Sequence, residues 1–218
     1  MDSLTEWQIS KLRLKGSRPL VICDVDEVVV HFLRGLEAFL GEQGMWLDPA
    51  SFALNGNIRE KDTNEPVSGA HIGGLIERFF SEWTGGLEEI EGASDALRLI
   101  SEHADVVMLT NMPDAYKSDR IANLKGHGMD YPVVSNAGPK GPSVRHMAAM
   151  IDHPVVFIDD TPNNVRSVTE HAPDVHVLHF MQDHRFRRHL PELSGVIGSV
   201  DNWEDGNQLV MAAVNGAA

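Results

Sequence analysis

Short runs of apolar, β-branched residues recur along the chain and alternate with stretches of helical period. The stronger runs cover residues 19–24, 105–110, 153–160 and 174–180, and a weaker one covers 131–135. Strands that read as continuous apolar runs are buried on both faces of a sheet, and their alternation with helices is typical of right-handed βαβ units. The pattern therefore predicts an α/β fold built on a doubly wound parallel sheet.

Helices are predicted between these strands from periodicity and end signals. One follows His31, has an apolar face and ends at Gly44. A second covers residues 70–83 and carries a broad, unusually aromatic apolar face, which is more often core than substrate pocket. A third begins at Thr161, with Pro162 at its first position, a favourable pair for starting a helix.

One interval interrupts this alternation. The first two predicted strands are separated by about 80 residues, several times an ordinary crossover. Within the interval, residues 51–69 are polar and rich in turn formers. We therefore predict a small, mostly helical cap at residues 44–88, inserted into a core formed by residues 1–43 and 89–218. The alternative interpretation is a long surface excursion with no role in the site.

Composition and charge narrow the class of protein. The chain has 218 residues, 42% hydrophobic and 23% charged, which suits one globular domain with a small insertion. We find neither an apolar run near the roughly 18 residues of a membrane span nor a signal peptide, so we expect a cytoplasmic protein with no membrane partner. The net charge of −14 argues against nucleic acid as a partner. The short basic stretch at 185–189 is expected to be a solvated turn.

Cysteine and histidine residues suggest no site of their own. The single cysteine, Cys23, lies in an apolar run and is predicted to be a buried core thiol, as suits a reducing compartment. The spacing of a histidine series matches no standard zinc pattern, so we expect these side chains to be structural or exposed. The series is His176, His179, His184 and His189.

Polar side chains that could take part in catalysis or ligand binding follow the predicted strands at their carboxyl ends, where open α/β sheets bind ligands. They are Asp24 and Asp26 after the first strand, Thr110 and Asn111 after the second, Lys140 in the loop GPKGPS that opens a helix, and Asp159 and Asp160 after the run 153–158. A carboxylate and a phosphate ester repel one another, so transfer of phosphate to an aspartate requires a divalent cation. Mg²⁺ prefers oxygen ligands, which Asp24, Asp159 and Asp160 can supply.

The remaining side chains of this set suit the other needs of phosphoryl transfer. Thr110 can donate a hydrogen bond to a phosphoryl oxygen, and Lys140 adds positive charge against the oxygens that become more negative in the transition state. Asp26 can protonate the leaving oxygen and then deprotonate water.

The segments DVDEV, LTN, the lysine of GPKGPS and FIDDTPNNV resemble, in order, the four motifs of the haloacid dehalogenase-like hydrolase superfamily. The resemblance implies that Asp24 is the nucleophile and that Asp26 is the general acid/base. It also implies Mg²⁺ as cofactor and a small phosphorylated substrate. The implied metal ligands are Asp24, Asp26 through its backbone carbonyl, Asp159 and Asp160, and the implied phosphate-binding residues are Thr110, Asn111 and Lys140.

The second aspartate selects among activities of this superfamily. Because the dehalogenase branch lacks it, Asp26 points to phosphate esters, and the leading hypothesis is a Mg²⁺-dependent phosphatase that forms an aspartyl-phosphate. Glu27 stands where many members carry a small residue, and it could crowd the pocket mouth or help to select substrate. The choice between Asp159 and Asp160 as direct metal ligand stays open, as do the substrate and the oligomeric state.

Three alternatives remain beside this hypothesis. One is a catalytically silent binding domain of the same fold, and another is a phosphoaspartate signalling receiver, a class of shorter chains. The third is a phosphonate-cleaving enzyme, which would use a cap lysine. Lys61 is the lysine within the predicted cap, but it lies among acidic residues and is expected to be solvated.

Overall fold

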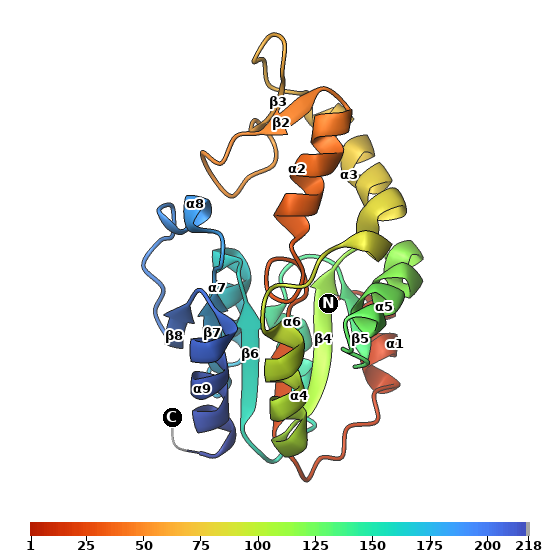
Figure 1. Ribbon diagram of the computed structural model, residues 1–218. Helices are drawn as coiled ribbons and strands as arrows, with labels where there is room; N and C mark the ends of the chain where they lie inside the picture. Colours follow the sequence, from red (N-terminus) through yellow and green to blue (C-terminus); the bar gives the residue numbers. More distant parts are fainter. Residues whose placement is uncertain (217–218) are drawn as a thin grey trace.

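A parallel sheet with helices on both faces forms the centre of the computed structural model, which describes residues 1–216 (Figure 1). The order of strands across the sheet is β5-β4-β1-β6-β7-β8, and every neighbouring pair is parallel. The predicted α/β fold with a doubly wound sheet is confirmed, and each predicted strand is present. The strands are β1 (Leu20–Cys23), β4 (Asp105–Asn111), β5 (Val133–Asn136), β6 (Val155–Asp159), β7 (His176–Phe180) and β8 (Val196–Val200).

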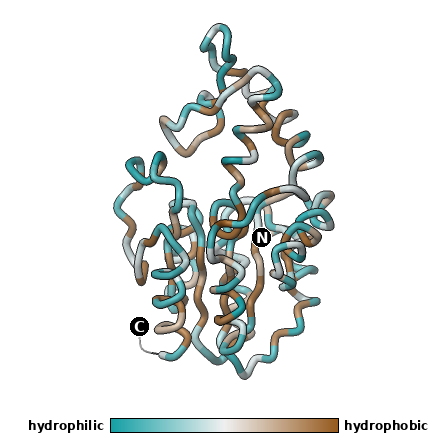
Figure 2. The backbone as a smooth tube through the Cα atoms, viewed as in Figure 1, coloured by the Kyte–Doolittle hydropathy of each residue, from teal (hydrophilic) through white to brown (hydrophobic). Residues whose placement is uncertain are grey.

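Two apolar clusters sandwich this sheet. Alternate residues of β1 divide between them: Val21 and Cys23 join the cluster on the side of α4 and α9, and Leu20 and Ile22 join the cluster under α1, α6 and α7. This division explains why the sequence of β1 is apolar without a break. The strands accordingly run hydrophobic through the middle of the molecule (Figure 2). The flanking helices are α1 (Ser3–Ser10), α4 (Ala93–His103), α5 (Lys117–Gly126), α6 (Gly141–Ala148), α7 (Pro162–His171) and α9 (Trp203–Val214).

The long interval after β1 stands over the carboxyl ends of the strands (Figure 1). It contains α2 (Phe32–Glu42), the antiparallel pair β2 (Met45–Leu47) and β3 (Ile58–Glu60), α3 (Gly69–Trp83) and the 3₁₀ turn η1 (Thr84–Gly86). We call residues 32–83 the upper layer. The predicted helix over 70–83 is α3, which begins one residue earlier, and the side chain of Ser68 caps it by accepting from His71 N. The β2–β3 pair was not expected from the sequence.

Helix ends follow the predicted signals in most details. Helix α2 ends at Glu42, and Gly44 adopts a left-handed φ of 73°. Thr161 and Pro162 begin α7 as predicted, but the Thr161 hydroxyl makes no bond to the helix backbone and donates to Asp160 Oδ1 instead.

The basic stretch at 185–189 is a solvated turn only in part: residues 188–189 form an exposed turn, but the residues before them are helical. Residues His184–Arg187 form the short helix α8, which Asp183 caps, and Phe186 is buried within it. Arg185 pairs with Asp183 and with Glu37 of α2, so its charge is compensated. Cys23 is buried, as predicted. Within residues 1–216, no helix combines the length and the apolar character that crossing a membrane would require.

Candidate active site

The loop after β1 is fixed on both sides of Asp24. The backbone N–H of Asp24 donates to the carbonyl of Ile158 in β6 at 2.9 Å, so strand pairing extends to the aspartate. The N–H of Val25 donates to Asp24 Oδ1 at 2.6 Å and restrains the carboxylate. Because β1 lies between β4 and β6, Asp24 sits in the middle of the sheet edge, among the ends of the other strands.

Glu27 gives this loop its turn into the upper layer. It is a non-glycine residue with a φ of 61°, a conformation uncommon for a residue with a long side chain. Its carboxylate accepts from the N–H of Leu33 at 2.7 Å, in the first turn of α2, where the N-cap residue His31 makes no side-chain cap bond. Glu27 therefore connects the loop that carries Asp24 to the first turn of α2. Burial raises the pKa of Glu27 to about 7.

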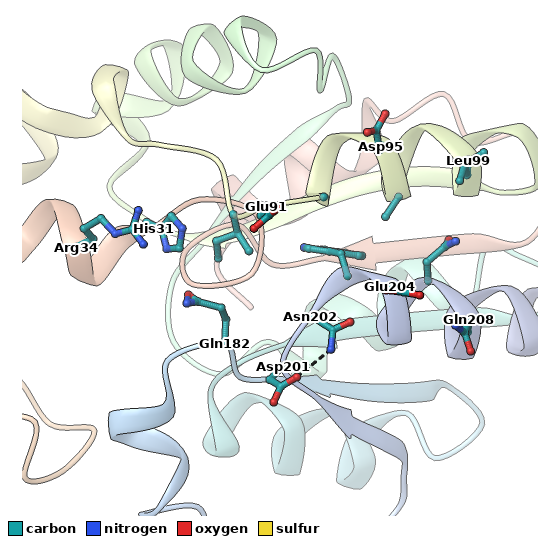
Figure 3. Close-up of a pocket in the computed structure, with 15 residues that line it drawn as sticks. His31, Arg34, Glu91, Asp95, Leu99, Gln182, Asp201, Asn202, Glu204 and Gln208 are labelled. Atoms are coloured by element: carbon teal, nitrogen blue, oxygen red, sulfur yellow. Dashed lines mark hydrogen bonds between the residues drawn. The ribbon is translucent and has the colours of Figure 1, made fainter.

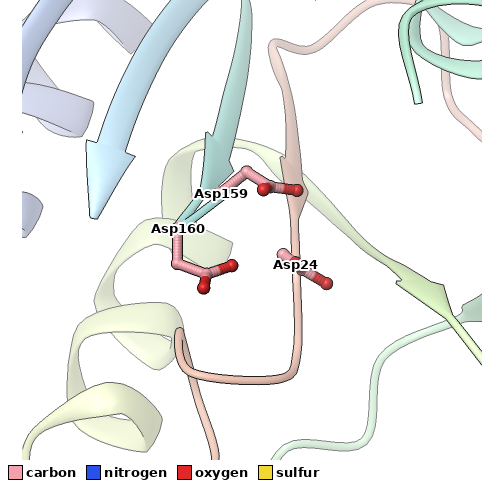
Figure 4. A group of neighbouring side chains, drawn as sticks. All are labelled: Asp24, Asp159 and Asp160. Atoms are coloured by element: carbon pink, nitrogen blue, oxygen red, sulfur yellow. The ribbon is translucent and has the colours of Figure 1, made fainter. Parts of the chain in front are cut away.

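Three carboxylates meet between the ends of β1 and β6 (Figure 4). They belong to Asp24, Asp159 and Asp160, and one oxygen of each lies within 4.8 Å of the others. Lys140, fully buried, bridges two of them: its Nζ lies 2.6 Å from Asp24 Oδ1 and 2.7 Å from Asp159 Oδ2. The ends of β1 and β6 and the start of α6 thus converge on one buried charged centre.

The charges of this centre are not balanced by protein groups. Burial raises the pKa of Asp24 and of Asp160 well above the usual aspartate range, and the neighbouring carboxylates add to the effect. Burial also disfavours the Lys140 ammonium, but the carboxylates of Asp159 and Asp24 outweigh it and raise the pKa of Lys140. Three carboxylates face one ammonium, which leaves two negative charges without a partner when all are ionised. The oxygen ligands and this charge fit a divalent cation.

The two acids after β6 differ in how the protein uses them. Asp159 accepts from Lys140, from the N–H of Thr161 and from the Asn164 amide. Among residues 1–216, Asp160 accepts at its carboxylate only from the Thr161 hydroxyl. Asp160 therefore retains more free lone pairs for another ligand. His179 Nε2 lies 2.9 Å from the Asp160 carbonyl, and because a carbonyl only accepts, this nitrogen carries the proton that fixes the Asp160 backbone.

Asp26 is held by a residue that the sequence reasoning missed. Arg120 of α5 is fully buried and donates from Nη2 to Asp26 Oδ1 at 2.6 Å. Burial raises the pKa of Asp26, although the Arg120 guanidinium acts in the opposite direction. A buried arginine has no signal in the sequence here, because α5 is polar over most of its length.

The two residues at the end of β4 behave differently. The Thr110 hydroxyl is fully buried, has no hydrogen-bond partner among the described residues and does not line the pocket described next, so its hydrogen-bonding capacity is unused within the protein. The Asn111 amide donates to the carbonyl of Gly138 at 3.0 Å and accepts from Asn136 at 2.7 Å. Asn111 therefore braces the loop that leads to Lys140, and it also borders the pocket described next.

A pocket of about 490 Å³ opens above the carboxylates and lies between the sheet edge and the upper layer. Asp24, Asp26 and Asp160 form its floor together with Glu27. Lys61 does not line it and instead donates to the carbonyl of Gly41. A pocket in this volume range, with polar groups at one end, is typical of a small-molecule site.

A larger pocket of about 640 Å³ lies beside the N-terminal ends of α4 and α9 (Figure 3). Its labelled side chains include His31, Glu91 and Asp201. None of the predicted site residues lines it. The chemistry predicted from the motifs is therefore located in the smaller pocket.

Solved structures of similar fold come from several bacteria, whereas no family model and no curated protein matches the sequence. A conserved haloacid dehalogenase-like protein of unknown function from Agrobacterium tumefaciens has a TM-score of 0.63 at 15% identity, covering 90% of this chain and 99% of that one. YfnB from Bacillus subtilis, solved with bound magnesium, has a TM-score of 0.62 at 11% identity, covering 89% and 99%.

A HAD family hydrolase from Deinococcus radiodurans, solved with phosphate and sodium, has a TM-score of 0.59 at 14% identity, covering 92% of this chain and 98% of that one. A defluorinating L-2-haloacid dehalogenase is also similar, with a TM-score of 0.56 at 13% identity, covering 92% and 99%. These likenesses each extend over 89% to 92% of the chain. The chain therefore has the fold of the haloacid dehalogenase-like hydrolases.

Proposed function

We propose that this protein is a Mg²⁺-dependent phosphatase of the haloacid dehalogenase-like superfamily that hydrolyses a small phosphate ester through a phosphoryl group carried on Asp24. The observation that carries the proposal is the buried centre in which Lys140 bridges Asp24 and Asp159 beside Asp160. Such a centre combines a nucleophile, a fixed cation and oxygen ligands within reach of one phosphoryl group.

The hydrogen bonds of the acidic side chains favour Asp24 and Asp160 as the residues that would contribute carboxylate oxygens to Mg²⁺, because Asp160 has the fewest partners. The resemblance to the superfamily implies the backbone carbonyl of Asp26 as a further ligand. Asp159, whose oxygens already accept from Lys140, Thr161 and Asn164, would act mainly by orienting its neighbours. When bound, Mg²⁺ would reduce the repulsion between the Asp24 carboxylate and the phosphate.

The reaction would proceed in two steps, transfer of the phosphoryl group to Asp24 and its hydrolysis by water. An Asp24 oxygen attacks phosphorus, the ester P–O bond breaks, and Asp26 gives its proton to the departing alkoxide. Water then attacks the phosphorus of the aspartyl-phosphate, Asp26 takes the proton of that water, and phosphate leaves while Asp24 is regenerated. Burial raises the pKa of Asp26 against the opposing effect of the Arg120 and Lys140 cations, which moves the carboxyl group toward the protonated form that the first step requires. Lys140 and the free hydroxyl of Thr110 would bind the phosphoryl oxygens in both steps.

Asp26 distinguishes this proposal from dehalogenation, since a dehalogenase expels halide, which needs no proton. The ion pair with Arg120 keeps the Asp26 carboxyl group beside the site. The position of Lys61, exposed and outside the pocket lining, gives no support to a phosphonate-cleaving reaction that uses a cap lysine.

Residues 44–88 would act as the cap, opening for a small phosphorylated substrate and excluding water on closure. The remainder, residues 1–43 and 89–218, would form the catalytic core. The buried single thiol, Cys23, suits the cytoplasmic location expected from the sequence.

Hydrolysis of p-nitrophenyl phosphate by the purified protein, with Mg²⁺ and with EDTA, tests the proposal. We expect release that EDTA abolishes and Mg²⁺ restores, and Asp24→Asn should lower turnover by at least roughly a thousand-fold because it removes the nucleophile. Asp95→Asn, on the exposed face of α4, is the matched control and should turn over normally. Undiminished release by Asp24→Asn would overturn the assignment of the nucleophile, and full activity in EDTA would overturn the role of the metal.

A further inference from the structure

We propose that the substrate is a phosphate monoester of an uncharged alcohol with an aromatic or branched aliphatic group, and that the pocket discriminates against esters carrying a second anion. The inference rests on the proposed phosphatase function and adds the class of leaving group. It follows from the chemistry of the pocket wall beyond the phosphoryl-binding end.

The wall of the pocket is mostly apolar on the side of the upper layer and on the side of the core, and the polar side chains beyond its acidic end are uncharged: Ser51, Asn111, Thr161, Asn163 and Asn164. Phe32, Phe52, Leu54 and Phe80 come from the upper layer, and Met181 and Phe186 come from the segment after β7. The rings of Phe52 and Phe186 meet across the two sides, with centroids 5.8 Å apart, and those of Phe32 and Phe80 lie 5.9 Å apart. A leaving group above the carboxylates would therefore be in contact with aromatic and aliphatic carbon.

Within the described chain, no lysine, arginine or histidine side chain lines this pocket. Lys140 is buried beneath the floor, where it pairs with Asp24 and Asp159. Arg185, on the neighbouring helix α8, is already paired with Asp183 and Glu37. A second phosphate or a carboxylate on the leaving group would thus enter a mostly apolar space that offers it no counterion, and burial of an unpaired charge is strongly unfavourable.

Glu27 reinforces this selection. Its side chain lines the pocket near the turn into α2, where its carboxylate also accepts from Leu33 N. An ionised Glu27 would repel a second anion, and a protonated Glu27 would offer it no charge compensation. The left-handed backbone at this position keeps the side chain at the boundary between the loop and the upper layer.

Two esters of the same benzyl alcohol type test the inference: 4-methylbenzyl phosphate and 4-carboxybenzyl phosphate. They match closely in size and in the site of cleavage, and they differ in a remote negative charge. With Mg²⁺ present, we expect kcat/KM for 4-methylbenzyl phosphate to exceed that for 4-carboxybenzyl phosphate by at least roughly ten-fold. An equal or higher kcat/KM for 4-carboxybenzyl phosphate, with turnover still dependent on Mg²⁺, would overturn this inference and leave the proposed function standing.

A charge-introducing variant makes the test specific to the pocket. Phe52→Lys places a cation at the exposed rim of the pocket. It should reduce the preference for 4-methylbenzyl phosphate several-fold, chiefly through a higher kcat/KM for 4-carboxybenzyl phosphate. Trp7→Lys makes the same kind of change on exposed α1, away from the pocket, and should leave the preference unchanged. An unchanged preference in Phe52→Lys would contradict the proposed wall. Absence of turnover for both esters and for p-nitrophenyl phosphate would overturn the proposed function together with this inference.

Discussion

Arg120 and Asp26 make an ion pair in which the arginine is fully buried and the aspartate is partly exposed. Arg120 is completely inaccessible to solvent, and its Nε and Nη1 have no partner among residues 1–216, so Asp26 supplies its main compensation. Such a pair costs desolvation energy and is weak evidence for stability alone. Its position at the candidate general acid suggests that it keeps the Asp26 carboxyl group aimed at the leaving oxygen.

The leaving group reveals whether Arg120 acts through Asp26. Benzyl alkoxide needs a proton to depart, whereas p-nitrophenolate does not, so loss of aim should affect the two esters unequally. For Arg120→Met we expect kcat on benzyl phosphate to fall roughly ten- to hundred-fold, with a much smaller fall on p-nitrophenyl phosphate. Asp26→Asn should show the same inequality, enlarged. Equal losses on both esters would identify Arg120 as merely structural, and Arg98→Met on exposed α4 provides the control.

Proximity of the motif residues could be predicted from the sequence because parallel strands end at a common edge. Asp24, Thr110 and Asp159 each terminate a run of apolar residues, so their meeting follows from topology. Arg120 could not be predicted in this way. It lies on a polar helix, and its burial depends on how α5 packs over the loop after β1, which periodicity does not encode.

Helices α6 and α7 approach one another closely at Gly141, the residue after Lys140. A Cβ atom at Gly141 would lie 2.2 Å from the carbonyl oxygen of Ser167, and the N–H of Gly141 donates to the Ser167 hydroxyl at 3.1 Å. Glycine is therefore required by the contact and not by its own φ. The start of α6, and with it the backbone of Lys140, depends on this approach.

Gly141→Ala should destabilise the protein by about 1–3 kcal/mol, since the helices must separate, and should lower kcat because the Lys140 ammonium moves from Asp24. Gly74→Ala is the matched control: Gly74 lies on the exposed face of α3, where an added Cβ meets nothing within 4 Å. There, alanine should stabilise by about 0.5–1 kcal/mol through helix propensity. Urea unfolding of both variants decides the matter, and similar effects of the two substitutions would contradict the packing argument.

Strand β8, the β2–β3 pair and helix α9 were not predicted from the sequence, each for its own reason. Strand β8 lies at the edge of the sheet, is only partly buried and contains Gly198, so it lacks the apolar continuity of β1 or β6. The β2–β3 pair has three residues on each side, too few to show alternation. Helix α9 offered a usable signal, because Asn202 caps it and acidic residues occupy its first turn.

At the scale of the whole molecule, the upper layer is joined to the core on both sides of the pocket. On one side Tyr116 donates to Glu77 at 2.6 Å, and its ring stacks with Phe80 at 6.3 Å. On the other side Arg185 pairs with Glu37. Phe52 also meets Phe186 across the pocket, and His189 Nε2 lies 3.0 Å from the carbonyl of Pro49. The polar contacts between the two parts are largely exposed, so they would contribute little to stability and would permit opening and closing of the proposed cap.

Because of its acidic centre, the stability of the folded protein should depend on pH and on bound metal. Asp24, Asp26, Asp160 and Glu27 have pKa values raised in the folded protein, so their contribution to stability is complete at low pH and is lost as the pH rises through the folded pKa values. For Glu27 the window runs from its ordinary value of 4.5 to about 7. At about 1.4 kcal/mol per pKa unit, this group alone accounts for on the order of 3 kcal/mol.

Comparison of wild type with Glu27→Gln tests this contribution, because glutamine retains the acceptor for Leu33 N but does not titrate. The variant also loses the Glu27 charge that helps to raise the pKa of Asp160, which acts in the same direction. Lowered pKa values at His31 and His179 favour the folded state as pH rises through about 6.5, but they are common to both proteins and cancel in the difference. In EDTA, we expect the unfolding free energy of wild type to fall relative to Glu27→Gln between about pH 4.5 and pH 7.

Mg²⁺ bound only by the folded protein should stabilise wild type more at about pH 8 than at about pH 5.5, since protons compete for the same carboxylates. Urea unfolding at these pH values provides the measurement. A relative rise of wild-type stability with pH would contradict the burial of Glu27, and an equal effect of Mg²⁺ at both pH values would contradict carboxylate ligation.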